Sequence, residues 1–118
     1  MSILAWNVCG LYRKLKQTEV SNIIKQYKIL IFALFETRTK KGREGIFIKN
    51  LLAYNYYCNY NAHVNNHMLV LWKRSEIKLK VFHVMDQVIN CEILTSLSVG
   101  LIITFVYGHN DLMATRAL

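Results

Sequence analysis

The first third of the chain combines two apolar segments with an amphipathic segment between them. Residues 2–8 are mostly apolar and stop before Gly10, which predicts a short strand. Apolar residues then recur near one face of a helix that Lys28 closes. The apolar positions of this helix are Leu15, Val20, Ile23, Ile24 and Tyr27. The uninterrupted apolar run 29–35 is typical of a strand buried on both faces. This order predicts a strand–helix–strand unit.

Beyond position 36 the chain changes to short β-prone segments. A polar loop over residues 37–43 and a second helix over about 43–53 come first. Five predicted strands follow, separated by turn-like residues. They cover residues 56–60, 68–72, 77–84, 87–94 and 99–107. The Asn-rich segment 59–66 predicts a loop, because asparagine tolerates left-handed turn conformations. A mixed start that runs into an antiparallel meander predicts an α/β (α+β) fold with its layers stacked as a sandwich.

Composition and charge narrow the function classes. The chain has 118 residues, which fits one domain or part of one. Hydrophobic residues make up 53% of it, which excludes a disordered protein. Lys and Arg outnumber Asp and Glu by 15 to 7, giving a net charge of +8. A basic surface favours nucleic acid as a partner, ahead of an anionic membrane, and a solvated face without a partner is the alternative.

Cysteine spacing and the short apolar runs argue against a zinc protein, a disulfide-rich protein and a membrane-spanning protein. Cys9, Cys58 and Cys91 show no CxxC spacing, so neither a zinc site nor a disulfide framework is predicted. Reduced thiols are typical of an intracellular protein. The sequence shows no signal peptide, and its apolar runs are too short for a membrane-spanning helix. No glycine-rich phosphate loop occurs, so no small-molecule cofactor is expected.

Polar side chains stand where three of the predicted strands end. Asn7 ends the first strand, Glu36 follows the second, and both Tyr107 and Asn110 follow the last. If these strands share one sheet, their ends can converge on one rim, where α/β folds commonly place ligands. A carboxylate with an amide oxygen suits Mg²⁺, and a tyrosine hydroxyl with an amide nitrogen can hold a phosphate. Taken singly, Asn7 is typical of a turn or cap and Glu36 of a solvent-facing position.

Three motifs carry a resemblance to a known family. They are Trp-Asn-Val-x-Gly at residues 6–10, Glu-Thr-Arg at 36–38 and Phe-Val-Tyr-Gly-x-Asn at 105–110. These motifs resemble the opening motifs of the endonuclease/exonuclease/phosphatase superfamily, and most closely the endonuclease domains of plant LINE-type (non-LTR) retrotransposons. The resemblance implies that residues 1–118 are the N-terminal portion of a single domain whose C-terminal part is missing. The implied fold is an incomplete four-layer α/β sandwich of the DNase-like type.

The same resemblance implies roles for the strand-end residues. Asn7 and Glu36 would help to bind Mg²⁺ or Mn²⁺, and Tyr107 and Asn110 would contact the scissile phosphate of DNA. The family continues into a Gly-Asp-x-Asn motif and finishes with a Ser-Asp-His motif, and this sequence contains neither. The resemblance therefore implies a truncated, inactive Mg-dependent endonuclease-like (phosphodiesterase) domain. Its partners in the parent element would be the missing C-terminal half and a reverse-transcriptase region.

Two further hypotheses stand beside the nuclease one. The first is a non-catalytic basic module that binds nucleic acid. Its candidate contacts are Lys40, Lys41, Arg43, Lys73, Arg74, Lys78 and Lys80. The second is a relic with no function of its own. In that hypothesis the missing half supplies the other sheet of the sandwich, so apolar strand faces stay uncovered and the chain is poorly soluble.

Overall fold

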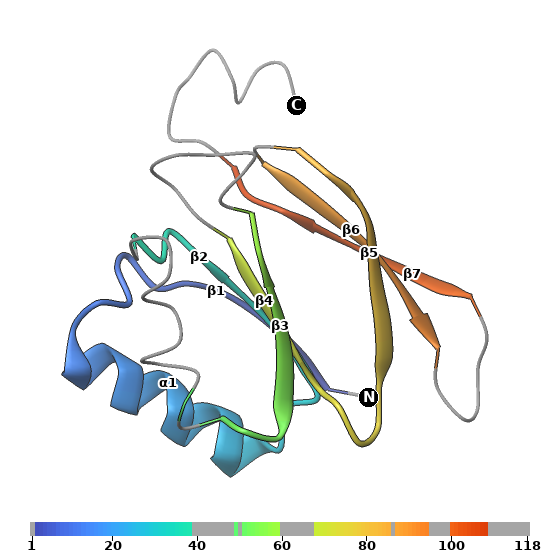
Figure 1. Cartoon of the computed structure of the whole chain (residues 1–118). Coiled ribbons are helices and arrows are strands. Elements are labelled where there is room, and N and C mark those ends of the chain that lie inside the picture. The colour runs from blue at the N-terminus through green and yellow to red at the C-terminus, as the bar shows by residue number, and fades with distance from the viewer. Residues whose placement is uncertain are drawn as a thin grey trace.

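The computed structural model describes residues 2–38, 49, 51–59, 68–85, 87–94 and 100–108. Within them the chain forms one helix and seven strands (Figure 1). Their order is β1 (Ile3–Asn7), α1 (Lys14–Tyr27), β2 (Ile31–Phe35), β3 (Tyr54–Cys58), β4 (Leu69–Lys73), β5 (Lys78–Val84), β6 (Val88–Leu94) and β7 (Leu101–Val106). Every predicted strand is therefore confirmed, with ends shifted by up to two residues where the structure describes them.

The strands form two sheets that pack face to face. The first sheet has the order β1-β2-β4-β3 and the second the order β5-β6-β7. β1 and β2 are parallel, as the strand–helix–strand unit requires, and the other pairs are antiparallel. Helix α1 covers the outer face of the first sheet, so the described residues form three layers, helix, sheet and sheet (Figure 1). The predicted mixed α+β sandwich is confirmed.

Apolar side chains fill both spaces between these layers. One cluster joins α1 to the first sheet around Val20, Ile24 and Phe32. The other joins the two sheets around Val70 and Ile89, and both of these side chains are fully buried. β2 contributes to both clusters because it lies inside the first sheet, which confirms that it is buried on both faces.

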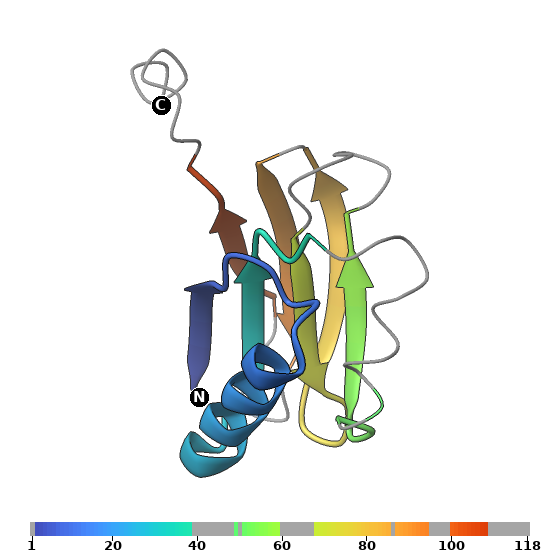
Figure 2. The ribbon, with the colours of Figure 1, turned by 90° about the vertical axis from the view of Figure 1, so that its left-hand side faces the viewer.

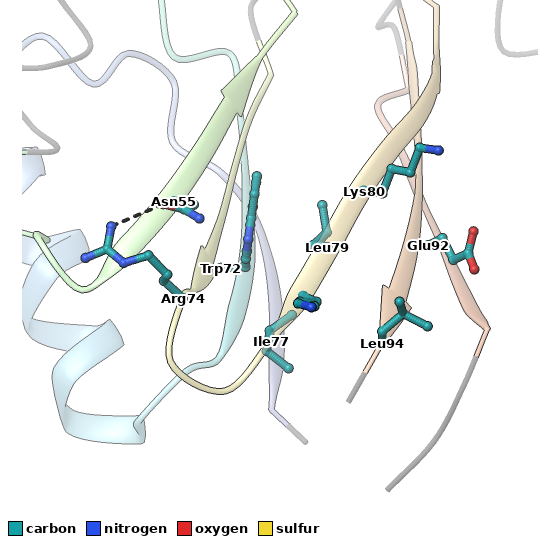
Figure 3. A pocket seen from close by; sticks show the side chains of 9 residues that line it. Asn55, Trp72, Arg74, Ile77, Leu79, Lys80, Glu92 and Leu94 are labelled. Carbon is teal, nitrogen blue, oxygen red and sulfur yellow. Dashed lines mark hydrogen bonds between the residues drawn. The ribbon is translucent and has the colours of Figure 1, made fainter. Parts of the chain in front are cut away.

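The expectation that a missing half of the domain supplies the second sheet is wrong. Strands β5, β6 and β7 form it from this chain, because the turn after β4 brings β5 back over the face of the first sheet. The inner faces of the two sheets therefore cover one another. At the end of this interface where β4 leads into β5, Trp72 of the first sheet faces Leu79 of the second (Figure 3). Apolar exposure remains on β7, where Ile102 keeps 61% of its surface accessible.

Helix α1 ends where the sequence predicted, but only part of its predicted apolar face is buried. Lys28 takes a left-handed conformation, φ 50°, and donates its backbone N–H to the carbonyl of Ile24, which closes the helix. Val20 and Ile24 are buried, but Leu15 is 86% and Tyr27 62% exposed. The predicted apolar face is therefore buried only in part, because the buried residues of α1 are Val20, Ser21 and Ile24. Leu11, in the loop before the helix, fills the cluster there instead.

Several sequence predictions fall mostly outside the described residues. The second helix was expected over about 43–53, of which the structure describes 49 and 51–53. Residues 52–53 form a turn before β3 rather than helix. The loops expected over 37–43 and 59–66 are described only at 37, 38 and 59. Within the part of the chain that the structure describes, no helix is both long and apolar enough to cross a membrane.

Strands β1 and β7 lie at the same side of the sandwich. Among the described strands, each pairs with a neighbour on one side only, β1 with β2 and β7 with β6. Figure 2 shows both strands at the left-hand border of their sheets. The side chains at the ends of these two strands are therefore brought near one another, although the strands belong to different sheets.

Candidate functional site

Parallel pairing of β1 with β2 positions the first two candidate residues. Asn7 ends β1 and is paired with Phe35, so Glu36 comes directly beyond that pair. Backbone hydrogen bonds continue past both strands. The N–H of Gly10 donates to the carbonyl of Glu36 at 2.7 Å, and the N–H of Leu11 donates to that of Thr37 at 2.7 Å. Backbone hydrogen bonds therefore fix the position of the rim that carries Glu36.

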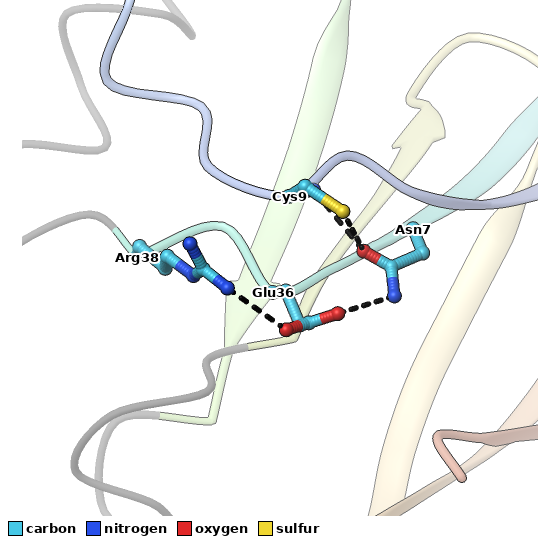
Figure 4. A network of polar contacts seen from close by, with 4 residues as sticks. All are labelled: Asn7, Cys9, Glu36 and Arg38. Atoms are coloured by element: carbon cyan, nitrogen blue, oxygen red, sulfur yellow. Dashed lines mark hydrogen bonds and ion pairs between the residues drawn. The ribbon is translucent and has the colours of Figure 1, made fainter. Parts of the chain in front are cut away.

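The carboxylate of Glu36 is the centre of a polar network (Figure 4). The Asn7 amide donates from Nδ2 to one carboxylate oxygen, and Arg38 Nη2 donates to the other at 3.2 Å. Tyr107 contributes a further side-chain hydrogen bond to Glu36. The Asn7 amide is itself fixed, because the backbone N–H of Cys9 donates to its Oδ1 at 3.1 Å and the Cys9 thiol at 3.3 Å.

Tyr107 reaches this network from the second sheet. The three strand ends do not share one sheet, the condition under which the sequence predicted that they converge, since β7 pairs with β6 and not with β1 or β2. They converge because the sheets are stacked and both strands lie at one side. The N–H of Tyr107 donates to the carbonyl of Gln87 at 2.8 Å. Its ring packs edge-on against Phe35, with centroids 5.8 Å apart, so the site bridges the two sheets.

The backbone at this rim takes uncommon conformations. Cys9, Glu36 and Arg38 have φ values of 51°, 55° and 53°, in the left-handed region that residues with a Cβ seldom occupy. Such conformations cost on the order of 1–3 kcal/mol each and concentrate at functional sites. Gly10 follows with φ +101°, and a Cβ there would meet the Tyr12 ring at 2.8 Å, so this position requires glycine. The clustering of strain at this one rim supports its interpretation as a site.

Hydrogen bonding sets the charge state of the network. The Asn7 hydrogen bond is the largest cause that lowers the pKa of the Glu36 carboxyl, and the bonds from Arg38 and Tyr107 act in the same direction against desolvation. Burial, followed by the charge of Glu36, raises the pKa of Tyr107. At neutral pH the rim therefore holds a carboxylate beside a neutral phenol.

We expect Glu36 to make folding stability depend on pH in the acid range. Because its folded pKa lies below the ordinary value of 4.5, the carboxylate stabilises the fold above that pH, and this stabilisation is lost as pH falls through the lowered pKa. Glu36→Gln should flatten the fall of stability between about pH 6 and pH 3, measured by urea unfolding. Glu19→Gln, on the exposed surface of α1, controls for loss of one negative charge. An equal flattening in both variants would contradict the expectation.

The oxygen donors at the rim fit a hydrated divalent cation. Mg²⁺ is commonly bound through one or two carboxylates and keeps several waters. Glu36 supplies one carboxylate, whereas the Asn7 amide oxygen faces Cys9 and accepts hydrogen bonds from its N–H and thiol. No group of three or more His, Cys, Asp or Glu side chains gathers within the described ranges. A divalent cation held at this rim by the described residues would therefore keep several waters.

The structure brings three of the predicted site residues together. Asn7, Glu36 and Tyr107 meet in one network, whereas Asn110 lies outside the described residues. The weak nucleic-acid candidates Lys40, Lys41 and Arg43 also lie outside them. Sequence reasoning did not assign a role to Arg38, which pairs with Glu36. The signal was its spacing, two residues after the carboxylate in the Glu-Thr-Arg motif.

Several solved structures of other proteins share the fold of this chain. No protein-family model and no curated protein matches the sequence. A humanized D. rerio TDP2 superposes with a TM-score of 0.71 at 12% identity, covering 98% of this chain and 53% of that one. The 3′ phosphatase NExo from Neisseria, bound to a product DNA hairpin, gives 0.67 at 16% identity, with 99% and 46% covered. An endonuclease/exonuclease/phosphatase family protein from Bacteroides thetaiotaomicron gives 0.62 at 7% identity, with 86% and 46% covered.

These similarities extend over nearly the whole chain, although identities are low. The chain spans about half the length of the solved structures it resembles. Both sheets and the covering helix belong to the shared architecture, and the network at Glu36 stands on its rim. This chain therefore has the DNase-like fold of the endonuclease/exonuclease/phosphatase structures.

Proposed function

We propose that the chain is the N-terminal portion of a single Mg²⁺-dependent endonuclease (phosphodiesterase) domain and is inactive without the rest of it. The convergence of Asn7, Glu36 and Tyr107 on one rim carries this proposal. Three residues far apart in the sequence meet in one hydrogen-bonded network on strained backbone, in a fold that the solved nucleases and phosphatases share. The half-length match to those structures supports a domain that continues beyond this portion.

In this proposal each residue of the rim has a distinct task. Glu36 holds Mg²⁺ or Mn²⁺ together with Asn7, whose amide also orients the carboxylate. The Tyr107 hydroxyl and the Asn110 amide contact the scissile phosphate. When bound, the cation offsets negative charge on the leaving oxygen of the phosphodiester.

Incompleteness of the catalytic set is the reason to expect inactivity. The sequence lacks the Gly-Asp-x-Asn and Ser-Asp-His motifs that would supply the water-activating aspartate and the phosphate-stabilising histidine. General acid–base groups typically contribute about a hundredfold to ten-thousandfold each. The same motif pattern leads us to propose descent from a plant LINE-type retrotransposon, with a reverse transcriptase in the parent element. The three free cysteines, Cys9, Cys58 and Cys91, agree with an intracellular location.

Two measurements test the proposal. The purified chain should not nick supercoiled plasmid in the presence of Mg²⁺, and nicking that Glu36→Ala abolishes would refute the proposed inactivity. The metal assignment has a readout independent of activity. Mn²⁺ should bind the chain by electron paramagnetic resonance, lose that binding in Glu36→Gln and keep it in Glu19→Gln. Equal binding by both variants would remove Glu36 from the metal site.

Nucleic-acid binding without cleavage is a second candidate function. The net charge of +8 favours a polyanionic partner, and solved structures with this fold include NExo with a DNA hairpin and D. rerio TDP2 with single-stranded DNA product. Those ligands belong to those proteins. In this chain, two cavities at the end of the sandwich opposite to Glu36 are lined by Lys25, Lys28, Lys73, Arg74, Lys78 and Lys80.

A further inference from the structure

A cavity opens at the end of the sandwich farthest from the Glu36 rim. β4 runs antiparallel to β2 and pairs Trp72 with Ile31, so Trp72 lies beside the start of β2 while Glu36 follows its end. The cavity has a volume of about 620 Å³. Trp72, Ile77 and Leu79 supply apolar walls, and Arg74 and Asn55 lie at one side (Figure 3). It is separate from the polar network described above.

The walls of this cavity suit a planar aromatic group with a negative charge beside it. Trp72 presents its indole ring toward Leu79 across the space (Figure 3). Arg74 is held in place, since its guanidinium donates to Asn55 Oδ1 at 3.2 Å and to the carbonyl of Leu52 at 2.7 Å. A guanidinium fixed in this way loses little conformational entropy on meeting a phosphate. Lys78, with an exposed side chain, adds a second cation at the cavity.

A second basic cavity adjoins the first on the other side of the first sheet. Its volume is about 380 Å³, and Lys25, Lys28 and Lys73 line it with Tyr54 and Leu52. Lys73, which also pairs with Glu76 at 3.9 Å, and Arg74 are neighbours in sequence, so cations line both cavities at this end of the sandwich. Glu92 is the one acidic residue among those that line either cavity in the described part of the chain. Such a surface attracts a phosphate backbone.

We propose that this end of the sandwich binds single-stranded nucleic acid. One base enters the cavity beside Trp72, and the neighbouring phosphates lie on Arg74 and on the lysines Lys73 and Lys78. Base stacking on an aromatic side chain is tolerant of sequence, and a single strand exposes its bases for it. The binding surface is separate from the Glu36 rim. The proposal therefore does not depend on whether the chain is derived from a nuclease.

Trp72 itself can report the binding. The chain has two tryptophans, so Trp6→Phe leaves Trp72 as the single indole emitter. An oligothymidine should change Trp72 emission on titration, and its affinity should fall with salt. For single strands, each phosphate contact contributes about 0.7 to the slope of log affinity against log salt concentration. Lys78→Ala and Arg74→Ala, each in the Trp6→Phe background, should therefore lower that slope by about 0.7.

Matched controls separate this surface from the rest of the molecule. Lys14→Ala removes a cation at the first position of α1, near the opposite end, and should leave the slope unchanged. Glu36→Gln should leave Trp72 quenching unchanged as well. A labelled oligothymidine followed by anisotropy tests Trp72→Ala, which should weaken binding roughly fivefold or more, since stacking on an aromatic side chain contributes about 1 kcal/mol or more.

Three results would overturn the proposal. The first is no change in Trp72 emission at low salt. The second is a salt slope that Arg74→Ala and Lys78→Ala both leave intact. The third is thymidine monophosphate binding as tightly as the oligonucleotide, which would make the cavity a site for free nucleotides and not for a strand. Thermal unfolding of Lys78→Ala, whose side chain is exposed, shows whether a loss of binding reflects a loss of fold.

Discussion

Replacing Tyr107 with alanine should lower the free energy of unfolding by about 3–5 kcal/mol, the range for large aromatic side chains removed from a core. Tyr107 is buried, packs edge-on against Phe35, and hydrogen-bonds Glu36 in the other sheet. Because a small domain is stable by only about 5–15 kcal/mol, this loss is a large part of the total. Urea unfolding followed by circular dichroism measures it.

Tyr107→Phe separates packing from hydrogen bonding at the same position. It keeps the ring against Phe35 and removes only the hydroxyl. Hydrogen bonds to charged groups contribute about 1.5–3 kcal/mol, so the loss should be clearly smaller than in Tyr107→Ala. The Tyr107 bond also lowers the pKa of Glu36, so its removal should move the acid-side loss of stability to higher pH. Identical losses in the two variants would contradict a packing role for the ring.

Phe32→Ala should cost a similar 3–5 kcal/mol at the opposite face of the first sheet. Phe32 is fully buried between β2 and α1, and its ring meets that of Tyr54 edge-on at 5.4 Å. Truncation leaves a cavity that the surrounding helix and sheet fill only in part. Chemical denaturation gives the value.

Leu15→Ala is the matched control for that substitution. Leu15 lies on α1 but is 86% exposed, so its truncation should change stability by no more than about 0.5 kcal/mol. A loss of several kcal/mol in Leu15→Ala would show that α1 buries the face expected from the sequence and not the face that the structure gives it. The pair of variants therefore tests the packing of α1 as well as the core itself.

Local sequence pattern was sufficient for the described strands, for α1 and for part of the site. The uninterrupted apolar run that becomes β2 can be satisfied only by burial on both faces, and β2 does lie between two apolar clusters. Glu36 could be singled out because a carboxylate directly after such a strand must either reach solvent or find partners. It finds them in Asn7 and Arg38. The C-terminal end of α1 was also predicted correctly, at Lys28.

Long-range arrangement was not readable from the same pattern. Alternation in β7 shows which side chains share a face, but not which strand pairs with it, because pairing depends on contacts between distant residues. For that reason the sequence could name one sheet only as a condition for the convergence of Asn7, Glu36 and Tyr107, and they converge from two sheets. The burial of Leu11 in place of Leu15 has a similar cause. The area of helix that a sheet covers is set by tertiary packing, which helical periodicity does not contain.

At position 36, the left-handed backbone conformation favours one amino acid and the polar network of the rim requires another. Glycine takes φ near 55° without steric penalty, whereas a residue with a side chain pays on the order of 1 kcal/mol or more there. The backbone conformation alone would therefore prefer glycine at this position, but glycine carries no carboxylate to bond Asn7 and Arg38. A glutamate here marks a position where chemistry and conformational preference favour different amino acids.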